Sequence, residues 1–377
     1  MQRTIRELFW AAAETPRQLM TSTVAGWNGY LRSAARRGVT PLDVALDCTE
    51  FLQAATRRAP TRFVHPNTVR RVWPLARLRE FSPTVPDGTV PTLVLPPLSG
   101  HASTLFDLTV DLSLVRTACD AGLRGVHCLE WLPPSSATSA AGIDDVVAVL
   151  TEAIEELGGI ANLVAYSQSG WLAAGYAAVH PRRVNTLTIA AAPIDFGPGI
   201  PDLTPVRSGR PGVAPAGATT VPPAATRTAA LRLAEWPEEW ARLMDLWAHI
   251  RDPVRVAAYV AVQSWLDAPQ GIPSGFYRWA AVHLFLRNEL VRSELEIDGS
   301  TVDLGAVTCP LFLLAGTRDP IVSARQLWAL ADHVSTPRNL ITRRVVATGH
   351  LGMVVDPEVL RRHWLPVLRD VADLSEP

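Results

Sequence analysis

The stretch NLVAYSQSGWLAAGYAA, residues 162–178, contains the pattern that decides the fold. Residues 162–166 form a short apolar run typical of a buried strand, and residues 170–180 are rich in alanine and predict a helix. Ser167 stands at the turn between them, with the small residues Ala165 and Ser169 two positions to either side. A nucleophile on a sharp strand-to-helix turn needs small neighbours, which are usually glycines. The pattern therefore predicts Ser167 as an exposed nucleophile at the carboxyl end of a sheet.

From Pro91 onward the chain alternates short apolar runs with helical segments. This alternation predicts a mainly parallel sheet with helices on its faces, and therefore an α/β fold. We expect strands at 92–95, 125–131, 162–166, 184–191, 311–315 and 339–346. We expect helices at 112–121, 144–157, 170–180, near 324–332 and from residue 357 onward.

Two segments stand outside this alternation. Residues 1–80 are predicted as an N-terminal helical segment, in which Thr40 caps a helix that has Pro41 at its first position. Residues 197–307 are predicted as an insertion, with a loop rich in Pro and Ala over 197–228 followed by helices that carry several tryptophans. These helices form either a lid over a pocket or a secondary core. The α/β core then falls into two halves, residues 81–196 and 308–377.

Composition and charge exclude several classes of protein. Of the 377 residues 48% are hydrophobic, which excludes wholesale disorder, and a net charge of -1 argues against a nucleic-acid partner. All 35 basic residues are arginine, so a Schiff-base or P-loop lysine is excluded. Residues 1–80 carry 13 arginines and 6 acidic residues, a net +7. Such a basic segment either contacts an acidic or amphipathic surface or is a solvated outer face.

Other patterns set expectations about compartment and cofactors. The four cysteines include no CxxC pair, and we expect reduced, mostly buried thiols in a cytoplasmic protein. No Asp, Glu or Arg occurs between Glu156 and Arg182, but this stretch divides into a strand, a turn and a helix, so no membrane span is expected. HExxH, Walker and early GxGxxG motifs are absent from the sequence, and we expect neither a metal nor a cofactor.

A serine nucleophile needs a base, and the base needs an acid that orients it. The order serine, acid, histidine is typical of this kind of fold. It points to Asp319 in GTRDP and His350 in TGHLG, each directly after a predicted strand and at the same sheet edge as Ser167. The alternative acids are Asp195 and Asp303, and the alternative bases are His101 and His283.

Hydrogen-bond donors for a tetrahedral intermediate are expected from two backbone positions. The first is the N–H of Gln168, the residue after the candidate nucleophile. The second should come from the loop after the strand at 92–95. Pro96 and Pro97 in that loop have no N–H, which leaves Leu98 or Ser99, and we favour Ser99.

Four segments, in this order, resemble the α/β-hydrolase core of polyhydroxyalkanoate synthases and intracellular polyhydroxyalkanoate depolymerases. They are TLVLPPLSG…HCLEW at 92–131, the box at 165–170, VDLGAVTCPLFLLAGTRDPIV at 302–322 and TGHLGMVVDP at 348–357. The resemblance covers about residues 65–370, apart from the Pro- and Ala-rich loop. It implies the catalytic acid at Asp319, the catalytic base at His350 and an acyl ester or polyester substrate.

The nucleophile box departs from the synthases of this family, which have a cysteine where Ser167 stands and glycines at positions 165 and 169. Because water readily hydrolyses a serine ester, the serine favours a hydrolase of esterase or depolymerase type acting on a hydroxyalkanoate polyester or a related acyl ester. An acyltransferase like the synthases, which passes an acyl group from CoA, a carrier or an ester to an acceptor other than water, is the alternative. A non-catalytic protein that binds polymer inclusions is the third hypothesis, and association with polymer granules fits all three.

Overall fold

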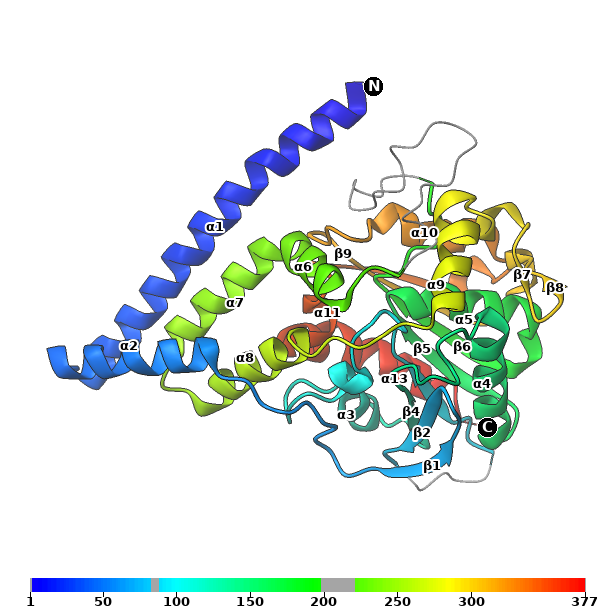
Figure 1. Cartoon of the computed structure of the whole chain (residues 1–377), viewed down its shortest axis with the longest axis horizontal. Helices are drawn as coiled ribbons and strands as arrows, with labels where there is room; N and C mark the ends of the chain where they lie inside the picture. Colours follow the sequence, from blue (N-terminus) through cyan, green and yellow to red (C-terminus); the bar gives the residue numbers. More distant parts are fainter. Residues whose placement is uncertain (1, 83–87, 198–220, 377) are drawn as a thin grey trace. The chain divides into compact units, whose positions relative to one another are not determined.

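The computed structural model describes residues 2–82, 88–197 and 221–376, with side chains described from Pro16 onward. The chain divides into two compact units (Figure 1). The helical unit combines residues 1–61 with Leu231–Asp267, and the sheet unit combines Arg62–Ala230 with Ala268–Pro377. Each unit is therefore built from two stretches that are far apart in the sequence.

One eight-stranded sheet forms the centre of the sheet unit, with the strand order β1-β2-β4-β3-β5-β6-β9-β10. The strands are β1 (Thr68–Val72), β2 (Ala76–Glu80), β3 (Thr92–Leu95), β4 (Val126–Trp131), β5 (Ala161–Tyr166), β6 (Val184–Ala190), β9 (Leu311–Gly316) and β10 (Ile341–Val346). The pairs from β4 to β10 are parallel, while β2 pairs antiparallel with β1 and β4. The predicted α/β class is confirmed, and each of the six predicted strands is present. A separate short ribbon consists of β7 (Glu296–Ile297) and β8 (Ser300–Thr301).

Helices follow most strands of the sheet. In the sheet unit they are α3 (Leu114–Asp120), α4 (Ile143–Glu156), α5 (Gln168–Val179), α9 (Ser274–Ala280), α10 (Ala324–His333), α11 (Gly352–Val355), α12 (Pro357–Val359) and α13 (Leu365–Asp373). α6 (Ala224–Ala234) runs across the division between the units in the sequence. None of the helices in the described ranges is both long enough and apolar enough to cross a membrane.

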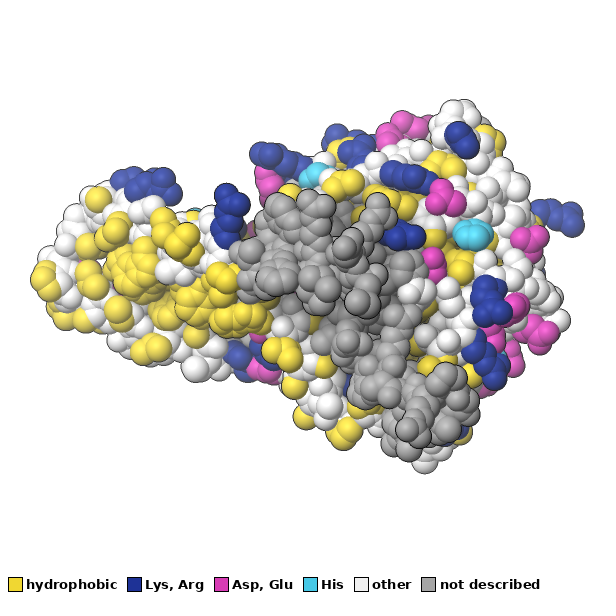
Figure 2. Space-filling model, turned by 90° about the horizontal axis from the view of Figure 1, so that it is seen from above, with side chains coloured by type: hydrophobic (Ala, Val, Ile, Leu, Met, Phe, Trp, Pro, Cys, Tyr) yellow, Lys and Arg dark blue, Asp and Glu magenta, His cyan; other side chains and the backbone are white. Residues whose placement is uncertain are grey.

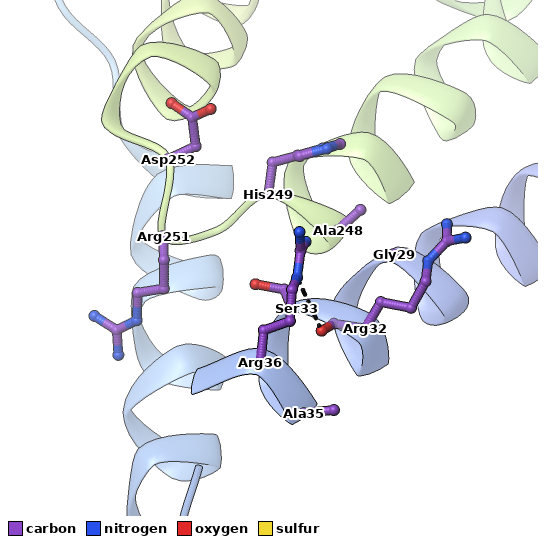
Figure 3. A pocket seen from close by; sticks show the side chains of 9 residues that line it. All are labelled: Gly29, Arg32, Ser33, Ala35, Arg36, Ala248, His249, Arg251 and Asp252. Atoms are coloured by element: carbon purple, nitrogen blue, oxygen red, sulfur yellow. Dashed lines mark hydrogen bonds between the residues drawn. The ribbon is translucent and has the colours of Figure 1, made fainter. Parts of the chain in front are cut away.

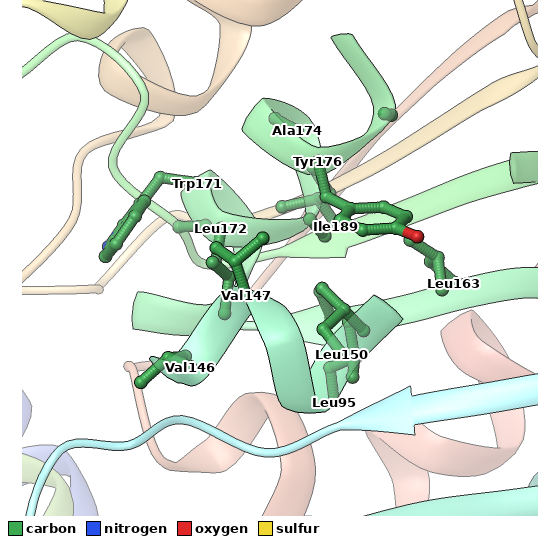
Figure 4. Packing of buried hydrophobic residues seen from close by; sticks show 14 of the residues in the cluster. Leu95, Val146, Val147, Leu150, Leu163, Trp171, Leu172, Ala174, Tyr176 and Ile189 are labelled. Atoms are coloured by element: carbon green, nitrogen blue, oxygen red, sulfur yellow. The ribbon is translucent and has the colours of Figure 1, made fainter. Parts of the chain in front are cut away.

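The main core lies between the sheet and the helices α4 and α5. Figure 4 shows Val147, Leu150 and Leu172 from these helices against Leu95 and Leu163 of the sheet, and each of the five is at most 3% exposed. Burial of a large aliphatic side chain contributes about 1.5–3 kcal/mol. This packing holds the start of α5 firmly on the sheet, directly after Ser167.

The N-terminal helical segment ends earlier than predicted. α1 (Gln2–Arg37) is followed by α2 (Pro41–Thr56), which begins at the predicted cap Thr40 with a complete capping box. Residues 68–72 and 76–80 are the strands β1 and β2, so the prediction of helix up to residue 80 is wrong there.

Long arginine side chains explain this error. In β2, Ala76 and Leu78 are buried, whereas Arg77 and Arg79 alternate with them on the other face. The guanidinium of Arg79 lies over the ring of Phe63 and pairs with Glu130 at 2.7 Å. The alternation of period two is therefore present, but charged residues occupy half of its positions.

The insertion at 197–307 is divided between the two units. α7 (Trp236–Ala248) and α8 (Pro253–Leu266) belong to the helical unit, whereas the sheet unit contains α9, whose residues Phe276 and Trp279 stack against Trp171. α6 begins at Ala224, inside the segment predicted as a loop, and residues 198–220 of that segment lie outside the described residues. A lid role for these helices stays a prediction.

A buried carboxylate ties the helical unit together. Asp47 of α2 accepts hydrogen bonds from the Tyr30 hydroxyl at 3.0 Å, from Arg37 at 2.7 Å and from Arg251 at 2.5 Å. Burial would raise the pKa of Asp47, but these hydrogen bonds outweigh it and lower the pKa. Tyr30 also stacks on Trp247, with ring centroids 4.1 Å apart. The end of α1, α2 and the turn after α7 therefore meet at one ionised group.

All four cysteines are free thiols, but they are less buried than predicted. Cys128 is buried, Cys119 and Cys309 are partly buried, and Cys48 is exposed on α2. Burial raises the pKa of Cys309 to about 11. The exposed Cys48 lies on the outer side of an amphipathic helix, which composition alone does not reveal.

Candidate active site

Ser167 occupies a strained turn between β5 and α5. Its backbone angles are φ 56° and ψ -129°, a conformation that favours glycine. Its N–H donates to the carbonyl oxygen of Ala190 in the neighbouring strand at 2.9 Å. A strained serine held in this way between a strand and a helix is the geometry of a nucleophile turn.

Two neighbours explain why the chain can make this turn. Gly170 allows α5 to pass close to β6, because a Cβ at this position would lie 2.3 Å from the Cβ of Ala192 and 2.6 Å from the Cγ2 of Ile189. The hydroxyl of Ser169 lies 2.5 Å from the carbonyl oxygen of Leu95 and accepts a hydrogen bond from the Tyr166 N–H at 3.1 Å. Small size at position 169 was expected from the sequence, but the hydrogen bonds that fasten the turn to β3 were not.

Ser167, His350 and Asp319 form a continuous chain of hydrogen bonds. The Oγ of Ser167 lies 2.9 Å from the Nε2 of His350, and the Nδ1 of His350 lies 2.8 Å from the Oδ2 of Asp319. The side chains of His350 and Asp319 are 6% and 0% exposed. The structure therefore brings together the three residues that the sequence singled out, although they are far apart along the chain.

The loop that follows β9 orients Asp319. Its Oδ1 accepts hydrogen bonds from the N–H groups of Ile321 and Val322, both at 2.8 Å. These bonds leave Oδ2 directed at the imidazole of His350. Both oxygens of the buried carboxylate are thus satisfied, so the aspartate can hold the ring in one orientation.

The two predicted oxyanion donors come from α5 and from the loop after β3. Gln168 opens α5, where the first N–H groups have no partner within the helix. Ser99 lies in the loop after β3, and its side chain is exposed. This loop starts beside the nucleophile turn, because Ser169 contacts Leu95. The role of both N–H groups stays a prediction.

Arg227 fastens the loop that contains Ser99. Its guanidinium donates to the carbonyl oxygens of Pro222 at 2.6 Å and Gln270 at 2.5 Å. It lies directly against Gly100 (φ 96°), where a Cβ would be 2.6 Å from Nη2. The N–H of Gln270 in turn donates to the carbonyl oxygen of Gly100 at 2.6 Å. Burial lowers the pKa of Arg227. Arg227 lies in a segment predicted as a loop and is not among the site residues expected from the sequence.

The alternative acids and bases form contacts elsewhere. The Oδ1 of Asp195 accepts from the side chain of Asn288, and that of Asp303 accepts from the N–H of Gly305. The Nδ1 of His283 lies 2.6 Å from Glu289, and the Nε2 of His101 lies 3.3 Å from the hydroxyl of Thr228. In the described part of the chain, no group of three or more His, Cys, Asp or Glu residues has an arrangement suited to a metal ion.

No protein-family model matches the chain. Its sequence is similar to the poly(3-hydroxyalkanoate) polymerase subunit PhaC of Haloferax mediterranei, with 23% identity over 284 residues, which cover 72% of this chain and 56% of that protein. The PhaC subunit of Synechocystis sp. is 24% identical over 311 residues, which cover 76% of this chain and 81% of that protein. The chain thus spans little more than half the length of the first of these relatives.

Solved structures similar to the chain include an α/β-hydrolase fold protein from Chitinophaga pinensis. It is 14% identical and has a TM-score of 0.47, and the match covers 85% of this chain and 98% of that one. A putative lipase from Acinetobacter baumannii is 12% identical with a TM-score of 0.45, over 88% of this chain and 96% of that one.

The order of elements around the sheet and the serine at the turn after β5 match the expectation from the sequence. The sequence is similar to those of polymerase subunits. At the turn after β5, where a nucleophile is expected, this chain has the serine Ser167. The chain therefore has an α/β fold with Ser167 at the turn after β5, and its sequence resembles those of poly(3-hydroxyalkanoate) polymerase subunits.

Proposed function

We propose that the chain is a serine hydrolase that cleaves a hydroxyalkanoate polyester, an oligomer of it or a related acyl ester. The observation that carries this proposal is the continuous hydrogen bonding from Ser167 through His350 to Asp319. A serine hydroxyl is a weak nucleophile near neutral pH, and a neighbouring imidazole oriented by a carboxylate is the arrangement that activates it.

Acylation begins when the Oγ of Ser167 attacks the ester carbonyl carbon. The Nε2 of His350 accepts the hydroxyl proton, and Asp319 stabilises the resulting imidazolium. The N–H groups of Gln168 and Ser99 hold the negative oxygen of the tetrahedral intermediate. The bond from carbon to the alcohol oxygen then breaks, and the proton on His350 passes to the departing alkoxide. The products of this step are a free hydroxyl end and an acyl-serine.

Deacylation repeats the sequence with water. His350 removes a proton from water as its oxygen attacks the acyl carbon, and the proton then returns to the Oγ of Ser167 as the ester bond breaks. The second product is a carboxylic acid. An oxygen ester at Ser167 favours this outcome, because a cysteine thioester is the better intermediate for passing the acyl group to another hydroxyl.

Acyl transfer is the second candidate, and the similarity to PhaC polymerases favours it. In that reaction the hydroxyl of a second molecule replaces water in the deacylation step, His350 again accepts the proton and Asp319 again stabilises the imidazolium. The two reactions differ only in the molecule that attacks the acyl-serine.

The test is to incubate the full chain and its Ser167→Ala variant with hydroxybutyrate oligomers and with hydroxyacyl-CoA thioesters. Mass spectrometry then identifies the bond that breaks and the acceptor. We expect shortened oligomers with free acid ends, formed only by the unmodified chain. Products longer than the substrate would instead establish acyl transfer. If a fluorophosphonate fails to label Ser167 and neither substrate is consumed, the chain is a non-catalytic binding protein.

A further inference from the structure

The helical unit carries two surface features that lie outside the candidate active site. Figure 2 shows hydrophobic side chains on its surface, and Met20 and Leu42 are among the exposed ones. A hollow of about 720 Å³ lies between the last turns of α1 and the turn from α7 to α8 (Figure 3), and Arg251 in its lining already pairs with Asp47. Neither feature contributes a residue to the chain of hydrogen bonds at Ser167, which belongs entirely to the sheet unit.

The loop after β3, residues 96–103, is held at its start from both sides of that strand. In the sheet, β3 lies between β4 and β5. The hydroxyl of Ser169, in the first turn of the helix that follows β5, lies 2.5 Å from the carbonyl oxygen of Leu95. The indole Nε1 of Trp131, the last residue of β4, donates to the carbonyl oxygen of Pro96 at 2.8 Å. Two successive carbonyl groups are therefore fastened, one from the side of β4 and one from the side of β5.

Trp131 also holds the other end of this loop. Its backbone N–H donates to the Oγ of Ser103 at 2.9 Å. Trp131 is 3% exposed, and its side chain belongs to the main core. The strand that carries it pairs with β2 on one side and with β3 on the other. One firmly packed residue therefore fixes both ends of the loop.

The hydrogen-bond donors in the middle of the loop remain free. Pro97 has no N–H, and the N–H groups of Leu98 and Ser99 donate to no acceptor among the residues that the structure describes. Ser99 is exposed, while Leu98 before it and Gly100 after it are buried. Backbone N–H groups of buried residues rarely lack a partner. Free donors in a loop that is otherwise fastened therefore indicate a place for the oxygen of a ligand.

We propose that Trp131 is a positioning residue for ester cleavage. It holds the loop so that the N–H of Leu98 or Ser99 meets the oxyanion that forms when Ser167 attacks the ester. This inference rests on the proposed function and names a residue on which its oxyanion stabilisation depends. Release of either end of the loop would let the free donors move, and a displacement of about 1 Å costs about 10²-fold in rate.

The first test is Trp131→Phe, which removes the indole N–H and keeps an aromatic ring in the core. We expect kcat for a soluble hydroxybutyrate ester to fall about tenfold or more while KM stays within about twofold, because the donor acts on the transition state and not on the bound ester. The matched control is Trp73→Phe, the same substitution in the same core. The indole N–H of Trp73 donates to the exposed Glu152 at 2.7 Å and not to the loop, so kcat should be unchanged.

A thiono ester, in which sulfur replaces the carbonyl oxygen, separates positioning of the donors from general loosening of the fold. Sulfur is a weak hydrogen-bond acceptor, so correctly placed donors favour the oxygen ester. Trp131→Phe should therefore lower the ratio of kcat for the oxygen ester to kcat for the thiono ester. Trp73→Phe should keep the ratio of the unmodified chain.

Ser103→Ala is the second variant, because it releases the far end of the loop without changing a ring. It should lower kcat and the same ratio, and it carries the test if Trp131→Phe does not fold. Thermal unfolding followed by circular dichroism shows which variants are folded at the assay temperature.

The inference is overturned if folded Trp131→Phe and Ser103→Ala keep the kcat and the ratio of the unmodified chain, or if only their KM rises. An equal loss of kcat in Trp73→Phe also overturns it, because a general defect of the core would then explain the loss. If the unmodified chain cleaves neither ester, the proposed function and this inference fail together. An active unmodified chain with unaffected variants removes the inference alone.

Discussion

The hydroxyl of Tyr166 donates a hydrogen bond to the carbonyl oxygen of His350 at 2.9 Å. The residue before the candidate nucleophile thus holds the backbone of the candidate base. Their rings also lie close, with centroids 5.2 Å apart. This contact joins the end of β5 to the loop after β10, and it fixes the distance across which a proton would pass.

Tyr166→Phe removes this hydrogen bond and keeps the ring. A single hydrogen bond contributes about 0.5–1.5 kcal/mol net, so we expect the melting temperature to fall by only a few degrees. We expect kcat for ester cleavage to fall about tenfold, because the His350 loop gains freedom, while KM stays within about twofold. Steady-state kinetics on a soluble ester would check this. An unchanged kcat would show that the loop is held by its other contacts.

Replacement of Asp319 by Asn tests whether this residue, and not the alternative Asp303, is the catalytic acid. The amide cannot stabilise the imidazolium and favours the wrong tautomer of His350, so kcat should fall by about 10⁴-fold. Asp303→Asn is the control, because Asp303 only caps a short turn through the N–H of Gly305. Turnover by that variant should be unchanged. Equal losses in both variants would contradict the assignment of Asp319.

Arg227→Met should slow the reaction through the loop that contains Ser99. The methionine fills much of the space above Gly100 but cannot donate to Pro222 and Gln270. Loss of a correctly placed oxyanion donor costs about 2.7–4 kcal/mol, which sets the upper limit of the effect on kcat. The exposed Arg278→Met is the control. Substrate binding should change little, so we expect KM to stay nearly constant. A rise in KM at constant kcat would contradict the role of Arg227 in positioning the loop.

Gly170→Ala should destabilise the sheet unit, because the added Cβ would lie 2.3 Å from that of Ala192. Overpacking of this kind costs about 1–3 kcal/mol in the free energy of unfolding. Gly142→Ser is the matched substitution at a helix start where a Cβ meets nothing within 4 Å, and serine is a good N-cap. Urea unfolding of both variants would compare them, and equal midpoints would show that α5 can shift away from β6.

The helical unit should lose stability in acid through Asp47. Its folded pKa lies below the ordinary value of 3.8, so its contribution is fully present above that pH. As the pH falls through the folded pKa, protonation breaks the contacts with Arg37 and Arg251, and the contribution is lost. Asp47→Asn should be less stable at pH 7 and should show a smaller loss between pH 5 and 2. Acid titration of both proteins, followed by far-UV circular dichroism, would compare their transitions.

Local patterns were enough to predict the six strands and to single out Ser167, Asp319 and His350. Apolar runs indicate buried strands directly, and each of the three residues stands in a turn just after such a run. β1 and β2 escaped prediction because β1 is exposed along its whole length and, in β2, arginines alternate with the buried Ala76 and Leu78. The hydrogen bond from Arg227 to Gln270 and the division of the insertion between the two units depend on contacts between segments that are distant in the sequence. No short pattern contains that information.

The stacked rings of Tyr30 and Trp247 have a consequence for biosynthesis, because Trp247 comes 217 positions later in the chain. A ribosome adds about 5–20 residues per second, so α1 and α2 wait about 10 to 40 s for the helices that cover them. During that time the faces of Tyr30 and Ala34 are open to solvent. The helical unit therefore completes its core only after Trp247 has been synthesised, long after α1 and α2.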